Sequence, residues 1–291
     1  LGPKFKSSEI TNYNIIFSDN IKINDQWGFL GGLNFTTYKG KSWNANGRKT
    51  GDYKHNEITP SIAITFKPQP WITTYASYIE SVDNVAPVGT SYKNAGDLLE
   101  PTISKQYEVG AKAELGEMFL TMALYQIDRA ATYSTADSFL VQDGQTRHTG
   151  LELAAQGRVF DALNIYGGMT FSRTKIRKAR LNVGKELPDA PKFTAKLYLE
   201  YDLPFLDGFT LTGSVNHYGK VFTNPSNNLS IPSHTIVDLG FRYAVELFGY
   251  DMAFRFNVQN IANKAYWYGG TGSHLVIGQP RSYSFIGEFN F

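Results

Sequence analysis

The chain has 291 residues, a formal net charge of +2 at pH 7 and no cysteine. The missing cysteine excludes disulfides, thiol nucleophiles and thiolate metal sites, and the small net charge gives no general attraction for nucleic acid. Aromatic residues make up 14% of the chain, charged residues only 19%, and there are 27 glycines. This composition favours β structure with long turns. No apolar run approaches the roughly 18 residues of a spanning helix, whereas a barrel strand needs only about nine to eleven alternating residues.

Alternating apolar and polar residues predict strands along the whole chain, in pairs joined by tight turns. In chain order the pairs are residues 13–23 with 27–38, 58–66 with 71–81, 105–115 with 119–129, 149–160 with 164–173, 193–203 with 209–218, and 234–247 with 250–259, before a last strand at 281–291. The tight turns recur at intervals of about 45 residues, which indicates a structural repeat of one hairpin. The other connections are longer and are predicted as loops, among them residues 40–56, 82–104 and 172–191.

Strand length and charge placement decide between two folds with this period. A propeller blade has four short strands, whereas each period here offers two strands of about 11 residues. The apolar faces of the clearest strands carry no charged residue, as lipid would require. Aromatic residues gather beside the tight turns, as in an interfacial girdle: Trp27, Trp71, Phe119, Phe160, Phe205, Phe209, Phe248 and Tyr250. We therefore predict an all-β, antiparallel up-and-down transmembrane β-barrel with about 13 strands in this chain.

The odd strand number is informative, because bacterial single-chain barrels have even numbers. The first predicted strand runs from the long-loop edge to the tight-turn edge. A segment of a larger barrel that begins within an extracellular loop would start in this way. The first residues, LGPKFKSS, also lack the apolar core of a signal peptide. The sequence thus predicts an internal start or a chain that needs no signal.

Three segments resemble TonB-dependent ferric-siderophore receptors: YASYIESVDNVAPVGTSYKNAGDLLEPTISKQYEVGAK at residues 75–112, VQNIANKAYW at 258–267, and GQPRSYSFIGEFNF at 278–291. The resemblance implies that residues 1–291 are the C-terminal portion of a barrel of about 22 strands. The N-terminal plug domain, its TonB-contacting motif and the first barrel strands would then be absent. The terminal aromatic residue, Phe291, would be the signal read by the barrel-assembly machinery.

The resemblance further implies a receptor of the bacterial outer membrane that binds a ferric siderophore at the extracellular side and imports it with TonB-derived energy. Iron would be carried within the ligand, so no cofactor is expected. Flat, often charged chelates suit aromatic faces and cations. Loop residues with that chemistry are Trp43, Tyr53, Tyr92, Tyr133, Arg147, Tyr266, Trp267 and Tyr268. Each of them alone also suits packing within a loop or at the rim.

Catalytic and metal-binding motifs are missing. The five histidines, His55, His148, His217, His234 and His274, match no zinc spacing and are interpreted as loop or rim residues. A polar barrel interior explains the many carboxylates, so neither an enzyme nor a resident metal is predicted.

The expected partners besides the siderophore and TonB are outer-membrane lipid and lipopolysaccharide. The basic segment at residues 172–180 either attracts lipopolysaccharide phosphates or an anionic chelate, or forms a solvated loop tip. No companion motif points to nucleic acid. The alternatives to a receptor are a porin-like passive channel, a surface adhesin barrel or, from another class, a soluble propeller enzyme.

Overall fold

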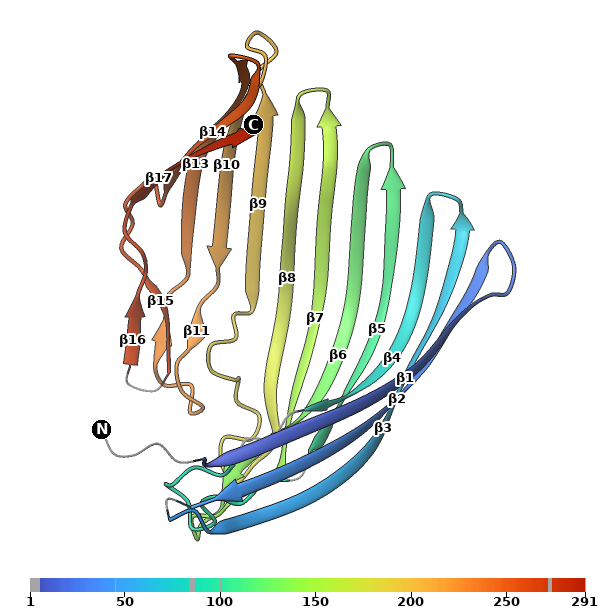
Figure 1. Cartoon of the computed structure of the whole chain (residues 1–291), viewed down its shortest axis with the longest axis vertical. Helices are drawn as coiled ribbons and strands as arrows, with labels where there is room; N and C mark the ends of the chain where they lie inside the picture. Colours follow the sequence, from blue (N-terminus) through green and yellow to red (C-terminus); the bar gives the residue numbers. More distant parts are fainter. Residues whose placement is uncertain (1–5, 45, 84–86, 100, 272–273, 291) are drawn as a thin grey trace. The chain divides into compact units, whose positions relative to one another are not determined.

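The computed structural model describes residues 6–44, 46–83, 87–99, 101–271 and 274–290, with the main chain alone for Tyr53, Asp83 and Thr271. All regular elements within these residues are β-strands (Figure 1). Their bounds are β1 (Ser8–Lys22), β2 (Trp27–Trp43), β3 (Lys49–Gln69), β4 (Ile72–Asp83), β5 (Thr102–Leu115), β6 (Met118–Ser134), β7 (Leu140–Phe160), β8 (Leu163–Lys178), β9 (Phe193–Asp202), β10 (Phe209–Tyr218), β11 (Val221–Phe222), β12 (Ser230–Ile231), β13 (His234–Leu247), β14 (Tyr250–Gln259), β15 (Trp267–Thr271), β16 (His274–Ile277) and β17 (Ser282–Asn290).

One 13-stranded antiparallel sheet contains all the long strands of the described residues, in the order β1-β2-β3-β4-β5-β6-β7-β8-β9-β10-β13-β14-β17. Each strand is therefore hydrogen-bonded to the next long strand along the chain. Two further pairs, β11–β12 and β15–β16, form small sheets of their own. The predicted number of long strands and their up-and-down order are confirmed.

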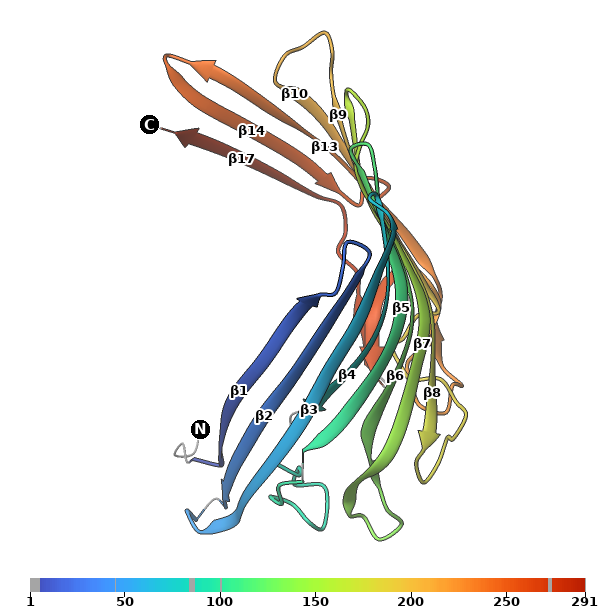
Figure 2. The ribbon, with the colours of Figure 1, turned by 90° about the vertical axis from the view of Figure 1, so that its right-hand side faces the viewer.

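The chain divides into two compact units. Unit 1 comprises Leu1–Gly110, Tyr125–Thr149 and Lys175–Lys185, and unit 2 comprises Ala111–Leu124, Gly150–Thr174 and Glu186–Phe291. In unit 1, β1, β2 and β3 run side by side (Figure 2). In unit 2, β13 is joined to β14, and β14 pairs with β17.

The closing strands pair as their alternation predicts. Met252 lies opposite Phe289, Phe256 opposite Phe285, and Val258 opposite Tyr283, so the apolar side chains share one face. The turn before β14 is made by Phe248 and Gly249, whose φ angles are +55° and +79°. Two successive positive φ angles are typical of the tight hairpin turn whose twist matches the flanking strands.

The apolar face of the sheet is exposed rather than packed into a core. The buried hydrophobic residues among those described are only Tyr38, Val88, Ile176 and Ile231. By contrast, Val109 is 52% exposed and Leu211 44% exposed, although both lie at apolar positions of their strands. Large exposed apolar surfaces are unstable in water. Hydrocarbon is the solvent that such a face requires.

Several strands are longer than predicted, so the loop predicted at residues 40–56 is wrong. β2 continues to Trp43 and β3 begins at Lys49, which leaves only a short turn between them. Likewise β8 continues to Lys178 through most of the predicted basic loop. These extensions need no continuous apolar face, because their backbone groups pair with the neighbouring strand while their side chains are mostly polar.

Candidate ligand-binding site

The predicted ligand-contact residues that the structure describes lie near the loop-side ends of strands or in the long connections. In unit 1, Trp43 ends β2 and has the Lys6 Nζ atom 5.0 Å from its ring centre. Tyr92 lies between β4 and β5, and Tyr133 lies in β6. The side chain of Tyr53 is outside the described part of the structure.

In unit 2, three predicted residues, Tyr266, Trp267 and Tyr268, are consecutive at the start of β15, which lies beside β11 at the loop-side ends of β10 and β13 (Figure 1). Trp267 and Tyr268 line a cavity of about 350 Å³. Its other walls come from the ends of β9, β10 and β13, from the β11–β12 hairpin and from the connection before β9. The lining residues are Asp189, Pro191, Thr194, Tyr218, Gly219, Val221, Ile231, Pro232, His234, Trp267, Tyr268, Gly269 and Gly270.

His234 is a buried polar residue in the lining of this cavity. Its ring stacks on Tyr218 at 5.3 Å and on Tyr266 at 4.6 Å between ring centres. Only 8% of the residue is exposed. Burial, together with the charge of Lys264, lowers the pKa of His234, against the opposite effect of a main-chain hydrogen bond to Pro232.

Sequence reasoning did not single out His234 and Tyr218, which both line the cavity. The two residues face each other across β10 and β13, as partners at the loop-side end of that strand pair. Tyr266 reaches the same place from a different connection, more than thirty residues further along the chain. Once β10 and β13 are aligned, His234 and Tyr218 share a face with Asp238, which is the polar face of β13.

Asn260 fixes the segment that carries Tyr266. Its Nδ2 atom donates to the carbonyl oxygens of Lys264 at 2.9 Å and Gln279 at 3.1 Å, and its Oδ1 atom accepts the Lys264 N–H at 2.8 Å. The Asn260 N–H donates to Asp238 Oδ1 at 2.7 Å. The buried Asn260 side chain thus ties both ends of the last long connection together, and its main-chain N–H bonds to Asp238 of β13.

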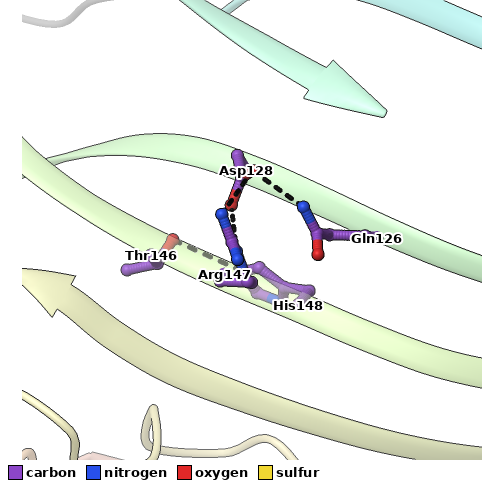
Figure 3. A network of polar contacts seen from close by, with 5 residues as sticks. All are labelled: Gln126, Asp128, Thr146, Arg147 and His148. Carbon is purple, nitrogen blue, oxygen red and sulfur yellow. Dashed lines mark hydrogen bonds and ion pairs between the residues drawn. The ribbon is translucent and has the colours of Figure 1, made fainter. Parts of the chain in front are cut away.

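A second polar cluster lies in unit 1 and contains Arg147 (Figure 3). The Arg147 guanidinium donates to both carboxylate oxygens of Asp128, at 2.6 and 3.0 Å, and this pairing raises the pKa of Arg147. Gln126 Nε2 also donates to Asp128, at 3.1 Å. By strand alternation Arg147 shares a face with Leu151 and Leu153, the apolar face of β7.

This placement makes Arg147 a rim residue of the membrane-facing side. We expect Arg147→Ala in the receptor to leave ligand affinity within about twofold and to lower the free energy of unfolding by about 1 kcal/mol, because a bidentate but partly exposed pair is lost. Arg147→Lys keeps the charge and is the matched control. Ligand titration together with thermal unfolding checks both statements, and a large loss of affinity without loss of stability would contradict the placement.

No group of three or more His, Asp or Glu side chains among the described residues is arranged to hold a metal ion. In the same part of the chain, no helix has the length and apolar character needed to cross a membrane.

Long two-faced strands, with tight turns at one edge and mainly longer connections at the other, define the class of protein, an outer-membrane β-barrel. Comparison with known proteins gives the family. Residues 2–261 match the family described as "TonB dependent receptor-like, beta-barrel", and the chain belongs to it. It is therefore part of a TonB-dependent receptor of the outer membrane, in a family of transporters and not of enzymes.

The similar proteins include receptors for several ferric chelates. The ferrichrome receptor FcuA of Yersinia enterocolitica is 29% identical over 78% of this chain and 31% of its own length. The ferrioxamine receptor of the same organism is 26% identical over 83% of this chain and 34% of its length. The crystal structure of BauA, the ferric preacinetobactin receptor of Acinetobacter baumannii, matches with a TM-score of 0.86 and 28% identity, over 98% of this chain and 43% of that chain. The chain thus spans about a third of the length of the two Yersinia receptors.

Proposed function

We propose that the receptor containing this chain binds a ferric siderophore at its extracellular side and imports it with energy from TonB. The observation that carries the proposal is the loop-side cavity of unit 2, which combines Trp267, Tyr268 and a buried histidine. Aromatic faces with a few placed polar groups suit the flat groups of such chelates. The names of the relatives, which are receptors for ferrichrome, ferrioxamine and preacinetobactin, point to the same ligand class.

The proposal also covers the remaining parts of the complete receptor. The complete receptor would add an N-terminal plug domain, its TonB-contacting motif and the first strands of a barrel of about 22 strands. Iron would enter as part of the ligand. Phe291, which lies outside the described residues, would be read by the barrel-assembly machinery. The basic segment at residues 172–180 supports contact with the anionic lipopolysaccharide of the outer leaflet. Membership of the receptor family favours this function over a passive channel or an adhesin.

Growth under iron limitation tests the proposal. The intact gene is deleted, and growth is measured on hydroxamate, catecholate and mixed ferric chelates, each supplied as the sole iron source. We expect growth on one class of chelate to be lost and to return with the gene. Growth that is unchanged on every chelate would reject ferric siderophore uptake as the function.

Trp267→Ala in the receptor is expected to lower ligand affinity about tenfold, because a large aromatic wall of the cavity is removed. Trp71→Ala is the matched control, since Trp71 lies at the tight-turn edge and is 47% exposed. Fluorescence titration of purified, folded receptor checks the difference. Equal affinities for the two variants would mean that the cavity does not contact the ligand.

A further inference from the structure

Two arginines lie directly opposite each other on the polar face of unit 2. Arg242 of β13 and Arg255 of β14 are partners in the antiparallel register. Both share a face with Asp238 and Asn257, which is not the apolar face of these strands. Directly opposite residues have their Cβ atoms about 4.5 to 5.5 Å apart, and like charges at such positions are destabilising. The fold therefore holds two cations together where they repel each other.

The contacts of the two arginines within the described residues do little to neutralise them. Arg242 Nη2 donates to a neutral hydroxyl oxygen, Thr210 Oγ1, at 3.3 Å. Arg255 has one long ion pair, with 3.6 Å between its Nη2 atom and Glu288 Oε2, and both side chains of that pair are about half exposed. Exposed pairs of this kind contribute little free energy, because water screens them. An additional anion would relieve the repulsion between the arginines.

A polar pocket of about 430 Å³ opens beside the two guanidinium groups. Its lining also includes Tyr198, Glu200, Thr212 and Asn257. Glu200 is the only acid in the lining, and its carboxylate accepts a hydrogen bond from the Tyr198 hydroxyl at 3.1 Å. Among the described residues no ion pair joins Glu200 to either arginine. With two cations and one anion, the lining has an excess of one positive charge.

Gly240 leaves room for hydrogen-bonding groups in this pocket. It lies on the same face as Arg242, between Thr212 of β10 and Asn257 of β14. A Cβ atom at Gly240 would lie 2.4 Å from Asn257 Oδ1 and 2.9 Å from Thr212 Oγ1. Any side chain there would displace both polar groups. The glycine therefore keeps a hydroxyl and an amide beside the two guanidinium groups.

The pocket is distinct from the loop-side cavity. Arg242 lies eight residues after His234, which is roughly 26 Å along the strand at about 3.3 Å per residue. It is only five residues from Leu247, the turn-side end of β13. The arginine pair is thus in the turn-side half of unit 2, away from the aromatic residues of the cavity.

We propose that Arg242 and Arg255 together bind one carboxylate in this pocket. A planar guanidinium donates two parallel N–H bonds to a carboxylate, and a single carboxylate matches the excess charge of the lining. The assignment rests on the proposed function only in placing this face toward the lumen of the complete receptor. The carboxylate belongs either to another part of that receptor or to a molecule that crosses the lumen, and the test separates these two sources.

Binding of a free carboxylate is measured on the intact receptor in nanodiscs by fluorine NMR. The probes are para-fluorobenzoate and para-fluorobenzyl alcohol, which has a similar shape but no charge. If a molecule crossing the lumen supplies the carboxylate, wild type binds the benzoate saturably, and Arg242→Gln and Arg255→Gln each lower its affinity about tenfold, because a charge-assisted hydrogen bond is lost. Lys196→Gln is the matched control, since Lys196 shares the face of Tyr198 but lies outside the pocket lining, and it should bind as wild type does.

A carboxylate of the receptor itself would keep the benzoate out, and cross-linking detects it. Arg242→Lys is treated with a water-soluble carbodiimide, which joins an amine to a carboxylate in contact with it, and the linked peptides are identified by mass spectrometry. In this case we expect a link from position 242 to an Asp or Glu outside residues 1–291. The melting temperature of each variant shows whether the barrel is intact. The assignment is overturned if benzoate binding is absent or independent of the arginines and position 242 links to no carboxylate other than Glu200, Asp202 or Glu288.

Discussion

Replacing Leu153 with lysine is expected to cause a severe loss of folded receptor from the membrane. Leu153 lies seven residues before Phe160, the turn-side end of β7. At about 3.3 Å per residue and a tilt of about 45°, this is roughly 16 Å along the membrane normal, near the middle of the apolar band. A lysine at that depth costs about 2 to 4 kcal/mol.

The surroundings of Leu153 offer the ammonium group little compensation. Leu153 lines a groove in unit 2 of about 730 Å³, whose walls are mainly small or apolar residues such as Ala111, Met122 and Ile165, with Lys196 as its one charged residue. Carboxylates are absent from the lining of the groove. The charge would thus have to reach the interface along its own side chain, and the full penalty for a charge near the membrane centre applies.

Two control substitutions show whether the loss depends on the side of the strand that carries the charge or on any change at this position. Gln156→Lys places the same charge on the opposite, polar face of β7 and should change the free energy of unfolding by less than about 1 kcal/mol. Leu153→Met keeps the site apolar and should also fold normally. The fraction of folded receptor is measured from the different gel mobilities of folded and unfolded protein in unheated samples. The free energy of unfolding is measured by urea titration. Equal yields for Leu153→Lys and Gln156→Lys would contradict the assignment of the membrane-facing side.

The membrane-spanning part of the fold could be predicted because two local signals agree there. The alternation of β14 fixes which side chains share a face, and the two-residue turn at Phe248 and Gly249 fixes the register with β13. The pairing of Leu247 with Tyr250 follows from these signals alone. Lipid makes the alternation of apolar and polar residues clearer, because each charged residue on the membrane-facing side lowers the stability of the protein.

Outside the membrane, alternation and turn sequence are weaker guides to the strands. The end of β2 and the start of β3 carry Lys39, Lys41, Lys54 and Asp52, and polar residues in water have no preferred face. Backbone pairing continues there, but the hydropathy pattern of the sequence does not show it. Arg147 was predicted to end a loop but lies within β7, because the strand continues beyond its apolar segment.

The cavity could be predicted only in part. Tyr266, Trp267 and Tyr268 stand out as an aromatic run in a long connection. His234 and Tyr218 do not, because their roles depend on contacts between residues far apart in the sequence. Burial of His234 is a property of the assembled connections and has no local signature.

Asn260→Ala is expected to loosen the whole last connection. The substitution removes three side-chain hydrogen bonds at a site that is only 3% exposed and leaves groups of Lys264 and Gln279 without their partner. Asn260 also has a φ angle of +49°, which asparagine tolerates better than alanine. Each buried group left unpaired costs about 1 to 3 kcal/mol, and alanine tolerates the left-handed backbone less well than asparagine does. Ligand affinity should fall as well, because Tyr266 and Trp267 lose their fixed positions.

Two variants separate the hydrogen bonds from the backbone strain. Asn260→Gly relieves the strain but restores no side-chain bond, so most of the loss should remain. Asn263→Ala is the matched control, because Asn263 has a φ angle of +48° but only one side-chain bond, from the Arg281 N–H at 3.0 Å. Hydrogen exchange of the Lys264 amide reports the contact directly, since that N–H donates to Asn260. If the amide exchanges no faster in Asn260→Ala than in Asn263→Ala, then Asn260 does not hold the connection, and the aromatic wall of the cavity must be fixed by the stack on His234 alone.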